Sequence, residues 1–189
     1  DTKRYPSLIG QSVEDLEKLS IALGQPSFRG RQLFDWIYRK KVDDFTQMTD
    51  LPKLLQEKLK GYSLHPLKIL NTNSSSSKKT QKYLLTTEKG MTIESVLMRK
   101  ENRATICLST QVGCAVDCSF CATAKMGFVK NLSVGEIIDQ YFQLERLSDT
   151  KITNVVFMGM GEPFLNYKNT IDAAKLLNHE KGINLGARR

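Results

Sequence analysis

The sequence predicts an α/β fold in which a small helical accessory domain precedes the first part of an incomplete (β/α) barrel. Apolar residues recur at helical spacing over residues 12–60, which predicts the helical domain. From residue 103 onward the pattern alternates strand, loop, helix, strand, loop and helix, which is typical of a parallel sheet with crossover helices. Two such β/α units cannot close a core, so we expect the 189 residues to be the N-terminal part of a longer fold.

Charge and composition restrict the class of protein. The chain has 28 Lys and Arg against 20 Asp and Glu, a net charge of +8 that favours a polyanionic partner such as nucleic acid. The alternative is a basic soluble protein without such a partner, which would show the same excess of positive charge. No apolar run approaches the roughly 20 residues of a membrane-spanning helix, and the first ten residues lack the apolar stretch of a signal peptide. We expect no membrane association.

The helical domain is expected over residues 1–70. Ser12 and Asp15 form a capping pair for a first helix, residues 28–40 read as a second helix, and Pro52 suits the first turn of a third. Basic residues on these helices form either a solvated face or an RNA-contacting face, and this stretch alone favours the solvated face. The residues that we consider for positioning RNA are Phe28, Arg29, Arg31 and Trp36.

Residues 71–102 are expected to be a linker loop followed by a β-hairpin. The Ser-rich residues 71–79 predict a flexible loop. Strand patterns at residues 82–87 and 91–98 flank Glu88-Lys89-Gly90, which suits a hairpin turn. The third predicted strand, residues 103–109, leads directly into the cysteines.

Residues 103–189 are expected to form the first, truncated part of the barrel. Ser133 and Glu136 make a capping box for a helix over residues 133–147. Residues 152–158 read as a buried strand that ends in Gly-Met-Gly-Glu-Pro, and residues 167–178 as a further helix.

The spacing C-x-x-x-C-x-x-C over Cys114, Cys118 and Cys121 is the strongest chemical signal. Thiolates ligate iron–sulfur clusters, and three ligands leave one iron of a four-iron (4Fe-4S) cluster free to chelate S-adenosylmethionine (SAM). A structural zinc site with Cys107 as fourth ligand is the alternative. The seven-residue step from Cys107 to Cys114 is unusual for zinc, so the spacing favours the cluster. Four cysteines within fifteen residues indicate a reducing compartment.

Three residues near the cysteines are candidates for binding SAM. Phe120 either packs beside the adenine of SAM or shields the cluster from solvent. Gly161 lets the backbone approach a ligand, and Glu162 suits the ammonium group of SAM. An isolated G-x-G also suits a tight turn, but its place one strand after the cysteines favours a binding role.

Together, the cysteine spacing and Gly-Met-Gly-Glu-Pro resemble radical SAM enzymes of the RlmN/Cfr type, most closely the RlmN group. Matching segments cover nearly the whole chain, at residues 28–33, 48–52, 103–107, 111–115 and 127–132. The resemblance implies a radical SAM (β/α) barrel, a 4Fe-4S cluster, SAM as cofactor, and methylation of adenine C2 in 23S ribosomal RNA and in tRNA. It also implies a reductant such as flavodoxin or ferredoxin, and we expect a monomer in the cytoplasm, or alternatively in a chloroplast or other organelle.

The resemblance assigns two catalytic residues, Glu94 as proton acceptor and Cys107 as the cysteine that resolves a covalent protein–RNA intermediate. From the residues alone, Glu94 reads as a solvent-facing strand residue and Cys107 as a small buried apolar residue. The family's methyl-carrying cysteine lies in its C-terminal half, and no cysteine follows Cys121. We therefore expect the chain to be inactive alone.

Two other functions remain open at this point. One is a catalytically incomplete short form that binds RNA or an iron–sulfur cluster. The other is a radical SAM enzyme acting on a small molecule, which the helical domain and the positive charge disfavour.

Overall fold

The structure is a computed structural model that describes residues 6–116 and 118–187. Its α-helices are α1 (Val13–Ala22), α2 (Phe28–Phe34), α3 (Lys53–Leu59), α4 (Val134–Arg146) and α5 (Tyr167–Asn178). Short π or 3-10 turns are η1 (Asp35–Arg39), η2 (Phe45–Gln47), η3 (Ala124–Met126) and η4 (Pro163–Asn166). The strands are β1 (Leu67–Ser74), β2 (Thr80–Thr87), β3 (Thr92–Lys100), β4 (Arg103–Cys107), β5 (Gln111–Gly113), β6 (Phe128–Asn131) and β7 (Ile152–Val156).

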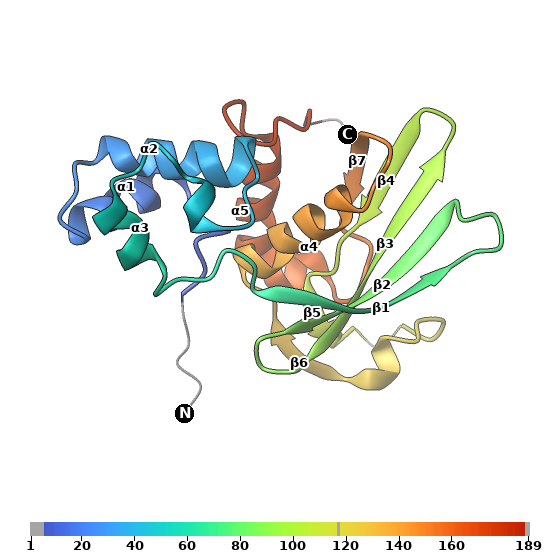
Figure 1. The fold of residues 1–189 in the computed structure, drawn as a ribbon. Coiled ribbons are helices and arrows are strands. Elements are labelled where there is room, and N and C mark those ends of the chain that lie inside the picture. Colours follow the sequence, from blue (N-terminus) through green and yellow to red (C-terminus); the bar gives the residue numbers. More distant parts are fainter. Residues whose placement is uncertain (1–5, 117, 188–189) are drawn as a thin grey trace.

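Helices α1 to α3 gather on one side of the molecule, as the sequence predicts (Figure 1). The capping box of Ser12 and Asp15 is present at the start of α1. The second predicted helix is α2 continued by the π turn η1, and α3 begins directly after Pro52. Gly30 lets α2 lie against α1, because a Cβ at Gly30 would collide with the backbone of Glu17. None of the described helices is long and apolar enough to cross a bilayer.

The other side is a five-stranded sheet with the order β1-β2-β3-β4-β7. The expected hairpin is formed by β2 and β3, and β4 pairs in parallel with β7. These pairings confirm the α/β class and the first parallel strands.

The prediction of a loop at residues 71–79 is wrong for the first half of that segment. Residues 71–74 extend β1, with Asn71 opposite Leu84 and Ser74 opposite Gln81. Pairing with β2 satisfies the backbone of this segment while its polar side chains stay in water, so polarity does not prevent a strand. The segment taken as linker and hairpin thus supplies strands to the same sheet as β4. The three-domain division itself stays a prediction.

Helices α4 and α5 lie between the sheet and the helical domain (Figure 1). The capping box of Ser133 and Glu136 begins α4 as predicted. Side chains alternate along β3, so that Ile93 and Leu97 are buried on the face toward α4 while Val96, between them, is half-buried on the other face. The second face is the more open one, and it carries the candidate catalytic residues described below.

Candidate functional site

The three clustered cysteines occupy a loop, residues 114–127, that we call the cysteine loop. Strands β5 and β6 pair at its base, with Gln111 opposite Asn131, and the Cys114 N–H donates to the Gly127 carbonyl at 3.1 Å. Gly113 has a φ of +71°, and a Cβ there would collide with the Gly127 carbonyl oxygen, so closure of the loop requires glycine. No sequence pattern predicted this small sheet of β5 and β6.

All three cysteine-loop thiols are free and partly exposed. Backbone N–H groups of Ala124 and Thr123 hydrogen-bond to Cys121 and lower the pKa of its thiol. The Val116 N–H points at the Cys114 sulfur, 3.5 Å away. Within residues 6–116 and 118–187, no group of three or more His, Cys, Asp or Glu side chains is arranged to hold a metal ion, so the three thiols share a loop without converging.

The donor set fits an iron–sulfur cluster. Clusters bind thiolates, and N–H donors at the sulfurs favour the thiolate form. Cys107 lies outside the cysteine loop, at the end of β4, where it is buried.

The loop after β7, residues 159–163, is held against the segment that leads into the cysteines; we call it the glycine loop. The Met160 N–H donates to Ser109 Oγ at 2.7 Å, and the Met160 carbonyl accepts the Thr110 N–H at 2.8 Å. The Glu162 N–H donates to Gln111 Oε1 at 2.9 Å. The glycine loop is thereby fixed to residues 109–111, which lead into the cysteine loop.

Gly159 and Gly161 of the glycine loop lie too close to other residues of the chain for a side chain to fit. Gly161 has a φ of +95°, and a Cβ on it would lie 2.5 Å from the Cβ of Gln111 and 2.7 Å from its backbone nitrogen. A Cβ on Gly159 would lie 2.6 Å from Ser109 Oγ. The close approach predicted for a ligand is thus made by the chain's own residues 108–111, and the role of Gly161 toward SAM stays a prediction.

The other two predicted SAM residues are accessible. Phe120 is 91% exposed at the tip of the cysteine loop. Glu162 is partly exposed and its Oε1 accepts the Phe164 N–H at 3.0 Å, which caps η4.

Glu94 and Cys107 lie on the same, open face of the sheet. Cys107 is directly opposite Val96 on β3, and Glu94 precedes Val96 by two residues, so all three side chains share one face. Glu94 forms an ion pair with Lys82 at 2.9 Å, in which both side chains remain nearly half exposed. Burial raises the pKa of the Cys107 thiol, an effect that a hydrogen bond from the Met158 backbone partly offsets.

Ser109 connects these parts, although it is not among the predicted site residues. Its hydroxyl donates to the Glu94 carbonyl at 2.5 Å and accepts the Met160 N–H, and its own N–H donates to Gln140 Oε1 at 2.8 Å. Gln140 is fully buried on α4 and also accepts the Ser95 hydroxyl at 2.6 Å. A polar residue on the apolar face of α4 was the only available hint.

The residues considered for RNA binding make contacts within the helical domain. Arg29 donates to Gln32 at 2.6 Å and stacks over the Phe28 ring at 4.8 Å. Arg31 pairs with Glu17 at 2.6 Å. The Trp36 indole donates to Asp50, and Lys40 lies 3.3 Å above its ring. Their role toward RNA stays a prediction.

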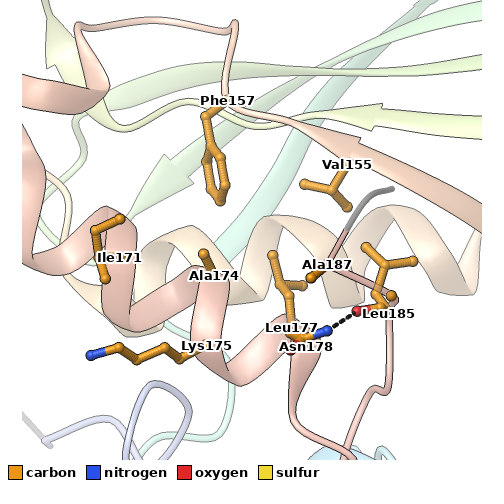
Figure 2. A pocket seen from close by; sticks show the side chains of 10 residues that line it. Val155, Phe157, Ile171, Ala174, Lys175, Leu177, Asn178, Leu185 and Ala187 are labelled. Carbon is orange, nitrogen blue, oxygen red and sulfur yellow. Dashed lines mark hydrogen bonds between the residues drawn. The ribbon is translucent and has the colours of Figure 1, made fainter.

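A pocket of about 420 Å³ between β7 and α5 is separate from this site (Figure 2). Val155 and Phe157 point from β7 and the residue after it toward α5, on the face of the sheet opposite to Cys107, which pairs with Val156. None of the predicted site residues lines the pocket.

Comparisons with known proteins agree with these features. Residues 7–64 match the family model "Ribosomal RNA large subunit methyltransferase N-terminal domain", and residues 108–188 match "Radical SAM superfamily". The chain is 46% identical over 184 residues to a protein of Thermotoga maritima named "Probable dual-specificity RNA methyltransferase RlmN", and 44% identical over 180 residues to one of the same name from Aquifex aeolicus. These alignments cover 97% and 94% of this chain, and 54% and 51% of the relatives.

A solved structure supports the same relationship. The crystal structure of a radical SAM methyltransferase from Sphaerobacter thermophilus superposes with a TM-score of 0.90 at 42% identity, covering 97% of this chain and 55% of that one. The chain therefore spans about half the length of the relatives that it matches. By sequence and by fold, the chain matches the N-terminal half of RlmN-type radical SAM methyltransferases.

Proposed function

We propose that the whole protein is a radical SAM methyltransferase that places a methyl group on C2 of an adenine in RNA, with 23S ribosomal RNA and tRNA as substrates. The observation that supports this most is that the glycine loop after β7 contacts both Ser109, which precedes the cysteine loop, and the backbone N–H of Glu94. In (β/α) barrels, the chemistry is carried at the C-terminal ends of the strands.

In this proposal Cys114, Cys118 and Cys121 hold a 4Fe-4S cluster. When bound, the cluster and SAM supply the radical that activates a methyl group. Glu162 orients SAM through its ammonium group, and the Glu162 carboxylate is already fixed by its bond to the Phe164 N–H. The exposed ring of Phe120 provides a face on which the SAM adenine packs.

Glu94 and Cys107 act on the RNA. The Glu94 carboxylate accepts the proton that leaves C2 of the adenine, and Lys82 holds that carboxylate on the open face of the sheet. Cys107 resolves the covalent protein–RNA intermediate. Burial raises the pKa of the Cys107 thiol, which favours the protonated form in the folded chain.

The 189 residues are not sufficient for methylation in this scheme. Three of the four cysteines hold the cluster and Cys107 is assigned to resolution, so none remains to carry a methyl group. Flavodoxin or ferredoxin is the proposed reductant, and the protein is proposed to be a cytoplasmic monomer.

The test joins this chain to the C-terminal half of the Thermotoga maritima relative. Nucleosides of RNA treated with the fusion, SAM and a reductant are analysed by mass spectrometry. We expect C2-methyladenine from the fusion and none from the 189 residues alone, and Glu94→Gln in the fusion should abolish it. Methylated adenine from the 189 residues alone would refute the division of roles among the cysteines. A fusion that cleaves SAM but leaves RNA unmodified would refute the proposal that RNA is the substrate.

A further inference from the structure

Two aromatic side chains stack on each other in solvent directly after the glycine loop. The ring centroids of Phe164 on η4 and Tyr167 on α5 are 6.3 Å apart, and the ring planes are 17° from parallel. Phe164 is 76% exposed and Tyr167 is 59% exposed. Aromatic side chains are normally large contributors to a core, so an exposed pair is surface that the described fold leaves unused.

The backbone beneath this pair is held rigidly. Asn166 is buried between the two aromatic residues, and its side-chain amide donates to the carbonyls of Thr110 and Leu132, each at 2.8 Å. The Phe164 N–H is capped by Glu162. The rings are therefore presented by a fixed turn, which reduces the entropy that a ligand must overcome.

The pair also lies beside the base of the cysteine loop. The Asn131 side chain on β6 donates to the Leu165 carbonyl at 3.4 Å, which joins the two segments. Val129, two residues before Asn131 on β6, is 56% exposed, and Leu165 is 52% exposed. Lys168, the next residue after Tyr167, has a side chain that is 87% exposed and forms an ion pair with Asp172 at 2.7 Å. Apolar surface with a neighbouring cation thus continues from the aromatic pair toward the candidate site.

We propose that Phe164 and Tyr167 form a stacking platform for an unpaired base of the RNA, adjacent to the adenine that is modified. Single-stranded RNA is recognised by bases that stack on aromatic side chains, combined with cations for the phosphates. A chain of net charge +8 attracts such a ligand. The inference rests on the proposed function, because it takes RNA to be the substrate.

Stacking has a signature that separates it from charge attraction. Losing an aromatic ring removes affinity without removing a phosphate contact, so the dependence of binding on salt keeps its slope. The experiment measures binding of the 189-residue chain to a single-stranded RNA that contains 2-aminopurine, by anisotropy over a salt series and by quenching of the fluorescent base. The variants are Phe164→Ala, Tyr167→Ala and the double variant, with Tyr167→Phe as the conservative substitution.

The control is Leu147→Ala, which removes an apolar side chain that is 50% exposed at the C-terminal end of α4. We expect each alanine variant of the pair to bind about tenfold more weakly, with an unchanged salt slope and with quenching lost in the double variant. Tyr167→Phe and Leu147→Ala should bind like the parent. Because both rings are exposed, the melting temperature should stay near that of the parent.

Equal affinity and equal quenching in the parent and the double variant would overturn the proposal. The aromatic pair would then be better explained as a surface that contacts protein. A tenfold loss accompanied by a flatter salt slope would also overturn it, since the rings would then act through charged neighbours. A parent that does not bind RNA at all would also overturn the platform. None of these outcomes decides the proposed function, which the methylation assay of the fusion tests separately.

Discussion

Replacing Gly161 by alanine tests whether the glycine loop must fit against the segment that leads into the cysteines. The new Cβ would lie 2.5 Å from the Cβ of Gln111 and 2.7 Å from its backbone nitrogen. Neither atom is at the free end of a side chain, so the two segments must separate. Their separation would strain the bond from the Glu162 N–H to Gln111 Oε1.

The size of the effect follows from two contributions. Gly161 has a φ of +95°, and a residue with a side chain in the left-handed region costs about 1–2 kcal/mol. Overpacking a tight contact adds about 1–3 kcal/mol. Gly90 separates the two contributions, because its φ is +76° but a Cβ there would meet nothing within 4 Å. We expect Gly90→Ala to lose about 1–2 kcal/mol of stability and Gly161→Ala about 2–5 kcal/mol.

Urea unfolding followed by circular dichroism measures both variants against the parent. Iron incorporation during anaerobic reconstitution is the second readout, and we expect it to fall in Gly161→Ala and to stay at the parent level in Gly90→Ala. Equal losses of stability in the two variants would show that backbone conformation alone matters at Gly161. The packing of the glycine loop against Gln111 would then have no energetic consequence.

Two further predictions concern buried groups. Tyr38→Phe should cost about 1–3 kcal/mol, because the buried hydroxyl accepts the Gly10 N–H at 2.8 Å and donates to the Gln11 carbonyl at 2.9 Å. Burial also raises the Tyr38 pKa, so above pH 10 the folded protein keeps a proton that the unfolded chain loses. The stability of the parent should therefore fall as the pH rises above 10, and it should fall more steeply than the stability of Tyr38→Phe. Iodoacetamide should alkylate Cys107 slowest among the four cysteines at pH 7.5, and faster as pH rises, because the Cys107 thiol is buried with a raised pKa. Peptide mass spectrometry checks this order, and early alkylation of Cys107 at pH 7.5 would contradict its burial.

Features set by local sequence were predictable. The capping boxes at Ser12 and Ser133 depend on residues three apart, and both are present. The helix predicted at residues 167–178 has the bounds of α5, and the hairpin around Gly90 has the expected strands. These elements need no information about distant parts of the chain.

Features set by distant contacts were not predictable. The polar half of β1 is a strand because β2 pairs with it, and β5 pairs with a strand that lies beyond the whole cysteine loop. The same holds in the candidate site. The spacing of the cysteines marks the loop, but Ser109 and Gln111 hold the glycine loop from about 50 residues away in sequence, and neither has a local signature. The cysteine motif therefore predicts the kind of chemistry, while tertiary contacts determine how the site residues are arranged.

The central claim is that Cys114, Cys118 and Cys121 hold a 4Fe-4S cluster without Cys107. Its most direct test is the iron content and visible absorption of the anaerobically reconstituted chain and of two alanine variants. We expect about four irons per chain with broad iron–sulfur absorption in the parent and in Cys107→Ala, and neither in Cys118→Ala. One bound zinc without iron–sulfur absorption, or loss of the cluster in Cys107→Ala, would contradict the claim.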